Sequence, residues 1–506
     1  MSFTPLRALL RQAQERPQGT AFFFHDEMWT YRRLADDSER IACGLAANDV
    51  RPGDRVVLHL LNRPELVVAY FACFRLGAIA TPLRPAFTFS ELADLLKRLQ
   101  PALYIGEVSL YSNIAPADTA ILPIARRILV DDHAGAHAAG SWDALKQAAP
   151  MQWPTPSIRE PAVLINTSGT TSGRPKFVAH SPSTLAAISN LICRNDGLTT
   201  DDISVSPLAM AHASGIFRSL AFVELGVPFV LRERFDADAV LDYVEHYRGT
   251  YLSGPPAHYA ALLRAQRARP RDLSSLRFGT IGGDSCPVDL QQEATSVLGA
   301  PLYNYWASTE TVGSLTFGLR AGPVARVAPQ AQIRLVDDQG TDVPHGAAGE
   351  LLIRGPNVFI GYWGDPAATG ESLRDGWYYT GDVMRRGDGD ELQFVARKKD
   401  VIVRGATNIS PIEVEDALLA SHPAVKEAAV VGKADRELGQ RVFAFVTLKS
   451  SATPTTVSEI LAGVQQRLAD YKVPEALFLL DELPRNALSK LDRAKLQAKL
   501  YARCPD

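Results

Sequence analysis

The chain has 506 residues, of which 46% are hydrophobic and 22% are charged, as in ordinary globular proteins. Its 53 Lys and Arg residues against 56 Asp and Glu residues give a formal net charge of −3. This near-balance argues against a nucleic-acid-binding protein, which usually has an excess of basic residues, and gives no support for an anionic membrane as partner.

The five cysteines are scattered and form no C-x-x-C pair, so they predict neither a disulfide framework nor a zinc site and suit a reducing compartment. The first residues lack a charged segment followed by a long apolar core, so we expect no signal peptide. No stretch approaches the roughly 18 uninterrupted apolar residues of a membrane span. The sequence therefore predicts a cytoplasmic protein without a membrane span.

Short apolar runs alternate with amphipathic segments over the first part of the chain. The runs are typical of buried strands and lie at 56–61, 162–165, 229–231 and 278–281. Helical patterns cover 65–75, 90–99, 237–247 and 256–267. Strands that alternate with helices of this length predict α/β units with largely parallel sheets. Residues 131–161, rich in Ala, Gly and Pro, predict a surface connector.

The pattern changes after residue 325. Strand-like runs follow at 332–336, 350–354, 392–395 and 401–404, and Asp388-Gly389-Asp390 predicts a hairpin turn. The C-terminal part mixes strands at 428–431, 442–448 and 476–480 with helices at 411–421 and 457–471, which predicts a compact α+β unit. We place the boundary at the charged run 397–400, so that residues 1–398 form a large N-terminal domain and residues 399–506 a small C-terminal domain.

The polar segment from Asn166 to Lys176 follows a predicted strand and is rich in Thr, Ser and Gly. Small residues let backbone N–H groups approach phosphate oxygens, and Lys176 supplies a point charge. It is not the usual P-loop, because Pro175 precedes the lysine and Phe177 follows it where Ser or Thr would stand. Taken alone, this segment is either a phosphate-binding loop or a mobile polar loop.

Three further segments could carry chemistry. In the segment 303–311, aromatic residues can stack on a base and the Glu310 carboxylate can hold Mg²⁺, although an aromatic strand end with an exposed acid has the same sequence. Asp382, after Thr380-Gly381, could accept hydrogen bonds from both ribose hydroxyls. The segment 484–490, which ends in Lys490, is nondescript by itself.

In this order and spacing the four segments resemble the adenylate-forming superfamily of acyl-CoA synthetases, peptide-synthetase adenylation domains and firefly-type luciferases. The resemblance runs from Phe22 to Leu496, is closest in pattern to acyl- or aryl-CoA ligases, and includes Gly53-Asp54-Arg55-Val56, Gly349-Glu350-Leu351, Gly361-Tyr362-Trp363 and the hinge-like segment 397–413. It implies an α/β fold: a large N-terminal domain of stacked αβαβα sheets plus a β-barrel-like subdomain, and a small mobile α+β C-terminal lid.

The resemblance also implies a reaction in two steps. A carboxylate attacks the α-phosphate of Mg-ATP to give acyl-AMP and pyrophosphate, and the thiol of CoA then takes the acyl group. The implied cofactors and partners are therefore ATP, Mg²⁺, CoA and a small fatty or aryl carboxylic acid, with no nucleic acid. Charge that develops on phosphorus must be neutralised while two anions that repel each other are held together.

The resemblance assigns roles to single residues. Lys490 matches the lysine that bridges the carboxylate and the α-phosphate, Glu310 the Mg²⁺-associated glutamate and Thr309 the adjacent phosphate-contacting threonine. The positions that match the phosphate loop are Thr167, Ser168, Gly169, Thr170, Thr171, Gly173 and Lys176. Those that match the ribose pair, the adenine-flanking positions and the hinge are Asp382 with Arg397, Gly283 with Asp284 and Trp306, and Lys399.

The resemblance does not decide which carboxylic acid is activated or which thiol accepts the acyl group. His212 matches the gate residue common in CoA ligases, with a buried structural histidine as the alternative. Ala213 and Ser214 follow it where amino-acid-activating relatives usually carry an Asp, which favours an acid without an α-amino group. Arg218 either reaches a second anionic group or faces outward from its helix.

Departures from the family pattern leave two alternative functions. Ala406 replaces a Gly that lines the pantetheine tunnel of many CoA ligases, so the acceptor could be the phosphopantetheine of an acyl or aryl carrier protein. The phosphate loop is one residue longer than usual, Trp306-Ala307 replaces Tyr-Gly, and Leu488-Ser489-Lys490 replaces Ser-Gly-Lys. These changes leave a non-catalytic nucleotide-binding protein as a remote alternative.

Overall fold

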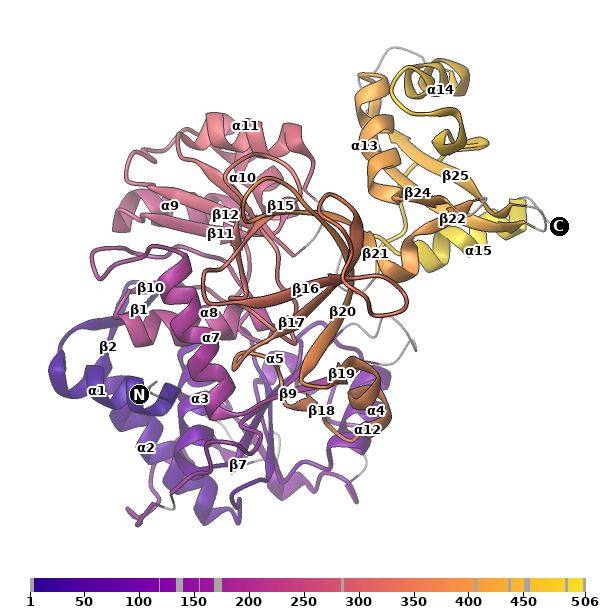
Figure 1. Cartoon of the computed structure of the whole chain (residues 1–506). Coiled ribbons are helices and arrows are strands. Elements are labelled where there is room, and N and C mark those ends of the chain that lie inside the picture. Colours follow the sequence, from indigo (N-terminus) through magenta and orange to yellow (C-terminus); the bar gives the residue numbers. More distant parts are fainter. Residues whose placement is uncertain are drawn as a thin grey trace. The chain divides into compact units, whose positions relative to one another are not determined.

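The computed structural model describes residues 4–117, 119–132, 140–153, 155–167, 175–283, 286–404, 407–435, 438–449, 456–486 and 490–503. The chain divides into two compact units, Met1–Gln332 with Ile353–Tyr378, and Ile333–Leu352 with Tyr379–Asp506 (Figure 1). Residues 333–352 and 379–398 thus group with the C-terminal residues. The hinge boundary at residue 398 stays a prediction.

One sheet of the first unit has the strand order β18-β9-β8-β4-β3-β5-β6-β7. Its strands are β3 (Arg55–His59), β4 (Ile79–Pro82), β5 (Leu103–Gly106), β6 (Arg127–Leu129), β7 (Gly140–Ser141), β8 (Val163–Asn166), β9 (Phe177–His180) and β18 (Gly361–Tyr362). The strands from β8 to β7 in this order pair in parallel, whereas β9 is antiparallel to both β8 and β18. This parallel pairing agrees with the α/β prediction.

The second sheet of this unit consists of two groups of three strands, in the orders β10-β1-β2 and β11-β12-β13. Their bounds are β1 (Thr20–Phe24), β2 (Glu27–Thr30), β10 (Phe229–Leu231), β11 (Tyr251–Gly254), β12 (Phe278–Gly282) and β13 (Leu302–Tyr305). Ser204 makes parallel bridges to Phe229 and to Tyr251 and so joins the two groups. Only β2 runs antiparallel to its neighbour within these two groups.

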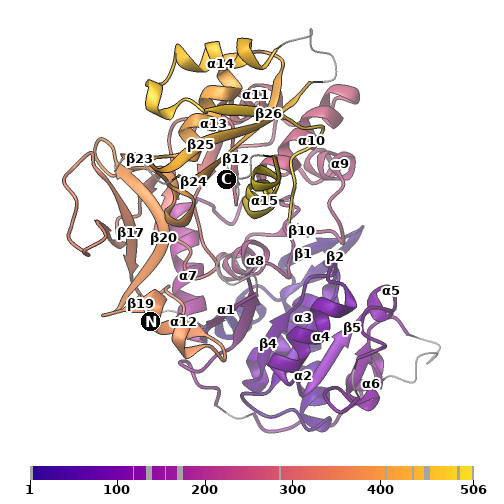
Figure 2. The same ribbon diagram turned by 90° about the vertical axis from the view of Figure 1, so that its right-hand side faces the viewer.

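Helices cover both faces of both sheets (Figures 1 and 2). They are α1 (Pro5–Glu15), α2 (Tyr31–Ala47), α3 (Pro64–Leu76), α4 (Phe89–Leu99), α5 (Val108–Tyr111), α6 (Trp142–Leu145), α7 (Pro182–Asn195), α8 (Ala213–Leu225), α9 (Ala237–Tyr247), α10 (Pro256–Ala268) and α11 (Val288–Leu298). Shorter elements of this unit are the 3₁₀ turn Ile124–Arg126, β14 (Leu315–Phe317), β15 (Val324–Val327), α12 (Pro366–Ser372) and β19 (Leu373–Arg374).

Three apolar clusters define the layers. The largest packs α2, α3, α7 and α8 between the two sheets, with Val56 and Leu58 of β3 on one side and Phe278 of β12 on the other. A second packs α9, α10 and α11 on the outer face of β10–β13. A third packs α4 on the outer face of the eight-stranded sheet. The order helix, sheet, helix, sheet, helix confirms the stacked αβαβα layers.

Capping residues in the sequence mark where these helices begin and end. At α7, Ser181 Oγ accepts from the Thr184 backbone N–H (3.2 Å) and Thr184 Oγ1 accepts from the Ser181 N–H (2.9 Å), a reciprocal cap. At α4, Glu91 accepts from the N–H of Thr88 at 2.8 Å. Helix α3 ends at Gly77, whose φ of 77° is the left-handed conformation that favours glycine.

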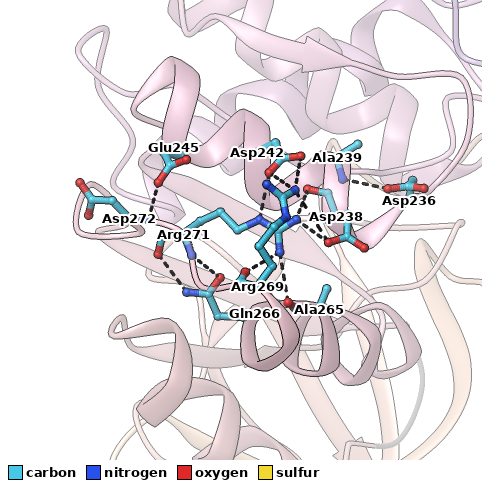
Figure 3. A network of polar contacts seen from close by, with 10 residues as sticks. All are labelled: Asp236, Asp238, Ala239, Asp242, Glu245, Ala265, Gln266, Arg269, Arg271 and Asp272. Atoms are coloured by element: carbon cyan, nitrogen blue, oxygen red, sulfur yellow. Dashed lines mark hydrogen bonds and ion pairs between the residues drawn. The ribbon is translucent and has the colours of Figure 1, made fainter.

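A polar network ties α9 to α10 and to the loop after α10 (Figure 3). The side chain of Arg271 is only 1% exposed. Its Nε donates to Asp242 (2.9 Å), one Nη donates to the carbonyls of Ala265 (3.1 Å) and Arg269 (2.7 Å), and the other pairs with Asp238. The buried guanidinium is therefore neutralised and hydrogen-bonded, as a buried charge must be.

The second unit contains two groups of strands and three helices among its described residues. The first group has the order β21-β20-β17-β16, and its strands are β16 (Gln332–Val336), β17 (Ala348–Arg354), β20 (Trp377–Arg386) and β21 (Glu391–Arg397). The second has the order β23-β22-β25-β24 with β26 beside β25, formed by β22 (Ile402–Arg404), β23 (Thr407–Ile409), β24 (Val425–Asp435), β25 (Gly439–Leu448) and β26 (Ala476–Leu479). The helices are α13 (Pro411–Ser421), α14 (Val457–Gln465) and α15 (Arg493–Arg503), with 3₁₀ turns at Lys398–Asp400 and Asp470–Lys472.

Most sequence-predicted elements are confirmed here, with one error. The predicted turn at 388–390 joins β20 to β21, with Gly387 N donating to Glu391 O at 3.0 Å. The helix predicted over 457–471 is too long, because α14 ends at Gln465. Leu468 and Val473 both pack against the core of this sheet, and a turn rather than a continued helix lets them do so. Among the described residues, no helix is both long and apolar enough to cross a membrane.

Candidate functional site

In the first unit, three of the sequence-predicted binding residues follow the carboxyl ends of strands. Thr167 follows β8, Gly283 follows β12 and Trp306 follows β13. Because Gly282 is paired in parallel with Tyr305, Gly283 and Trp306 lie side by side at one sheet edge. A Cβ at Gly282 would lie 2.4 Å from the Tyr305 carbonyl oxygen, and Gly283 has a φ of 85°, so this Gly-Gly pair is required by the backbone. The carboxyl edge of such sheets is where ligands bind.

The side chain of Tyr362 connects Glu310 to Lys176. Its hydroxyl donates to Glu310 Oε1 at 2.9 Å, and the Lys176 ammonium lies 4.5 Å from the centre of its ring. Burial, with the nearby Glu310 charge, raises the pKa of Tyr362. The phenol therefore stays protonated at neutral pH and donates to the carboxylate. A carboxylate and a cation from distant parts of the chain thus contact one tyrosine side chain.

The turn that carries Thr309 and Glu310 is held by buried polar groups. His180 Nε2 lies 2.9 Å from the Thr309 carbonyl oxygen, and since a carbonyl can only accept, Nε2 carries the proton. Burial lowers the pKa of His180 to about 4, so its ring is neutral. Phe359 N donates to Glu310 O at 2.8 Å. Asn357 donates to Val312 O (2.9 Å) and to two hydroxyls next to the turn, which fixes its position.

His212 is the N-cap residue of α8. Its Nδ1 accepts from the Ser214 backbone N–H at 3.3 Å and lies 2.9 Å from Ser214 Oγ. The ring is partly exposed. Residue 215 is glycine because a Cβ there would lie 2.1 Å from the Ala209 carbonyl oxygen. The cap fixes one ring nitrogen of His212 at the start of a buried helix.

In the second unit, Asp382 and Arg397 are directly paired residues of β20 and β21. Arg397 Nε lies 2.9 Å from Asp382 Oδ1, and Asp382 is only 3% exposed. The strand residues before Asp382 are held by Glu350, which accepts from Gly381 N (3.2 Å) and from Lys398 Nζ (2.9 Å). The structure thus brings together the predicted ribose pair.

Lys399 and Lys490 also belong to the second unit. Lys399 lies in the 3₁₀ turn after β21, where burial lowers its pKa. Lys490 is partly exposed, and its backbone is hydrogen-bonded to Asn486. Asn486 N donates to Lys490 O at 2.8 Å, and Lys490 N donates to Asn486 Oδ1 at 3.2 Å. Two hydrogen bonds with Asn486 thus fix the backbone of the predicted adenylation lysine.

Several predicted positions lie outside the described residues. They are Ser168, Gly169, Thr170, Thr171, Gly173, Asp284 and Ala406. Their assignments remain predictions. At the two ends of the phosphate segment, Thr167 N donates to Lys176 O at 2.9 Å, which continues the pairing of β8 with β9.

Comparison with known proteins decides the family. The AMP-binding enzyme family matches residues 9–363, and its C-terminal domain matches residues 413–490. The chain belongs to the AMP-binding enzyme family.

Its relatives are similar over nearly the whole chain. An indoleacetate–CoA ligase of Aromatoleum aromaticum is 34% identical over 95% of this chain and 95% of its own length. A medium-chain fatty-acid–CoA ligase of Escherichia coli is 32% identical over 95% of this chain and 87% of its own. The solved structure of o-succinylbenzoate CoA synthetase from Bacillus subtilis with its acyl-adenylate intermediate has a TM-score of 0.81 and 29% identity, covering 97% of both chains. The AMP-binding enzymes related to this chain thus include acid–CoA ligases.

The described residues fit the Mg²⁺ that the family implies. No cluster of three or more His, Cys, Asp or Glu side chains suited to a metal occurs among them. Mg²⁺ that travels with a nucleotide needs only one or two carboxylates, because phosphate oxygens and water complete its shell. Glu310 is a partly exposed carboxylate with one oxygen bonded to Tyr362.

Three residues that shape this site carry no recognisable signal of that role in the sequence. His180 and Asn357 hold the turn of Thr309 and Glu310, and Tyr362 joins Glu310 to Lys176. Tyr362 stood in the Gly361-Tyr362-Trp363 motif without a role. His180 is separated from Thr309 by 129 positions, and no local pattern signals that contact.

Arg218 neither faces outward nor is available to a second anionic group. It is 5% exposed and pairs with Asp196 of the α7 C-terminus. Its guanidinium lies 4.9 Å from the ring centre of Tyr305 and 5.5 Å from that of Tyr251. Burial opposes the charge, but the Asp196 carboxylate raises the pKa of Arg218 above its ordinary value.

Asp196→Asn should destabilise the first unit. It leaves the Arg218 charge buried without its counterion, which costs about 3 kcal/mol. Thermal unfolding of the purified variant should begin several degrees below that of the wild type. Asp49→Asn, which removes an ion pair whose side chains are 64% and 77% exposed, is the matched control and should change little. Equal unfolding temperatures for the two variants would contradict a stabilising role of the buried pair.

Proposed function

We propose that the protein joins a fatty or aryl carboxylic acid without an amino group to the thiol of CoA, with ATP as the energy source. It is an acid–thiol ligase of the AMP-forming acyl-CoA synthetase type. The observation that carries this conclusion is the nearly full-length match with acid–CoA ligases. The pairing of Glu310 with Tyr362 and of Asp382 with Arg397 supports it, because the family's motif positions are held in ordered geometry.

In the first step the acid carboxylate forms a bond to the α-phosphorus of ATP, and the bond to pyrophosphate breaks. We propose that Lys490 bridges the two reacting anions, which lowers their mutual repulsion and stabilises charge that develops on phosphorus. Glu310 would hold Mg²⁺, and the segment from Thr167 to Lys176 would bind the leaving pyrophosphate. Asp382 and Arg397 would hold the ribose, and Gly283 and Trp306 would flank the adenine.

In the second step the CoA thiol attacks the acyl carbonyl carbon, and AMP leaves with the electrons of the broken acyl–phosphate bond. We propose that His212 gates the approach of the thiol. Lys399 would lie at the hinge of a rotation that exchanges one acceptor for the next and keeps water from the acyl-AMP.

Two observations support an acid with a single carboxylate and no ammonium group. The residues after His212 include no carboxylate that could pair an ammonium group, since Ala213, Ser214 and Gly215 follow. Arg218, the cation on the same helix, is engaged by Asp196. A second carboxylate on the substrate would therefore find no available guanidinium there.

Exchange of labelled pyrophosphate into ATP tests the reaction directly. The purified chain with Mg²⁺ should catalyse exchange only when a suitable acid is added, and a panel of medium-chain, long-chain and aryl acids should identify its class. Amino acids should give no exchange. Nucleotide binding without exchange for any acid in the panel would instead identify a non-catalytic homologue.

Lys490→Ala should separate the two steps. We expect acid-dependent exchange to fall by about 100-fold or more, because the charge between two anions is lost. Thioester formation from supplied acyl-AMP should fall less than about threefold, since that step has no attacking carboxylate. Lys495→Ala, at a side chain 63% exposed and paired with Asp492, is the control and should leave both rates unchanged. An equal loss in both steps would contradict the role given to Lys490.

The acceptor can be decided by comparing two thiols. We propose free CoA, and Ala406 is the reason to keep a carrier-protein phosphopantetheine as the second candidate, because a methyl group narrows a channel lined by backbone. With the acid found by exchange, thioester should form on CoA, and Ala406→Gly should lower the KM for CoA without changing the exchange rate. Thioester on a phosphopantetheinylated carrier protein but not on CoA would overturn the choice.

A further inference from the structure

An unpaired arginine lies at the carboxyl edge of the eight-stranded sheet. Arg84 follows β4 by two positions. Its Nε is buried and has no hydrogen-bond partner, and among the described residues its guanidinium has no carboxylate partner. Glu107, a buried carboxylate that follows β5, already has other partners. It accepts from Leu61 N at 3.1 Å and lies 3.6 Å from Arg63.

Arg84 is partly exposed as a whole, but its Nε is buried, and a desolvated cation without a counterion is costly unless a ligand supplies the opposite charge. Desolvation lowers the pKa of Arg84 to about 10, which disfavours its charged form. The group is nevertheless still charged at neutral pH. The neighbouring His59 ring adds no second charge, since burial lowers its pKa to about 4. The site therefore carries one uncompensated positive charge, which calls for an anion.

The strand register places Arg84 beside the start of the phosphate segment. Ala80 of β4 is paired in parallel with Val163 of β8. On the other side of β4, Leu83 N donates to Leu58 O of β3 at 2.9 Å, so the chain stays in the sheet up to Leu83. Continued by four residues, the register brings Arg84 level with Thr167. Adjacent strands are about 4.8 Å apart, which a guanidinium side chain spans easily.

Two buried polar atoms near this edge also lack hydrogen-bond partners among the described residues. Thr81 is 0% exposed, and its Oγ1 has no hydrogen-bond partner in the described part of the chain. Asn166 is 2% exposed and its Oδ1 likewise has none. Thr81 lies on β4, the strand that precedes Arg84, and Asn166 lies on the neighbouring β8. Buried polar groups without partners are uncommon, and a hydrated polar ligand would satisfy them.

The strand order adds a reason for a ligand here. The chain passes from β3 to β4 on one side and then to β5 on the other, so the direction of the sheet reverses at β3. The crevice outside the carboxyl ends at such a reversal is the usual ligand site of α/β sheets. Arg84 follows β4 at the same carboxyl edge, on the other side of β3 from β5.

We propose that Arg84 binds a diphosphate group of a substrate. The inference rests on the proposed function in one respect, because ATP and CoA are the substrates that carry such a group. Arginine suits this task, since its planar fork donates two parallel hydrogen bonds to phosphate oxygens. The nearness of Thr167 favours the phosphates of ATP, and those of CoA are the other source.

Inorganic pyrophosphate is the direct probe. Calorimetric titration of the full chain should show binding by the wild type, and Arg84→Gln should weaken it by about 10- to 100-fold. Arg84→Lys keeps the charge and should lose less. Without ligand, Arg84→Gln should melt no earlier than the wild type, because it removes an uncompensated charge, whereas a merely structural arginine would lower the melting temperature. Arg51→Gln, at a side chain 64% exposed, is the control and should bind like the wild type.

Steady-state kinetics identify the source of the diphosphate. A raised KM for ATP in pyrophosphate exchange, where no CoA is present, assigns Arg84 to the nucleotide. A raised KM for CoA with an unchanged KM for ATP assigns it to CoA. Wild-type values of both KM, together with unchanged pyrophosphate binding by Arg84→Gln, would overturn the proposal. Pyrophosphate binding by a wild type that exchanges with no acid would contradict the proposed function and leave the role of Arg84 standing.

Discussion

The burial of α3 and α8 between two sheets is the constraint on which the first unit depends. Both helices contribute to the apolar cluster that joins β3 and β4 to β12. Helices without a polar face cannot lie at the surface, so sheets must cover them from both sides. Helices then cover both faces of each sheet, so the side chains on those faces are mostly apolar. Polar segments collect instead at the carboxyl edges, where the strands end at Thr167, Gly283 and Trp306.

Much of this architecture could be predicted from local patterns. The strand 332–336 and the helices 237–247 and 411–421 have the predicted bounds, because apolar spacing and caps act within a few residues. The end of α14 could not be predicted, since the packing of Leu468 and Val473 into a distant core decided it. The candidate residues were likewise named from motifs, whose order along the chain is local information.

What holds those candidates could not be predicted. The contact of His180 with Thr309 and that of Tyr362 with Glu310 join parts of the chain far apart in sequence. The pairing of Arg218 with Asp196 reversed the expectation of an outward-facing arginine, because helix periodicity does not show what packs against a helix. Motifs therefore indicated which side chains carry chemistry, while tertiary packing determined their support and their charge.

The neutral state of His180 has a consequence for the whole protein. His59, His180 and His258 all have pKa values lowered to about 4 by burial, from an ordinary value of 6.5. The unfolded chain therefore binds protons at these rings before the folded chain does. Their contribution to stability is complete above about pH 6.5 and is lost as the pH falls toward 4. Between about pH 4 and pH 6.5, folding therefore releases protons from these rings. Acid destabilises the fold partly through His180, the histidine that supports Thr309.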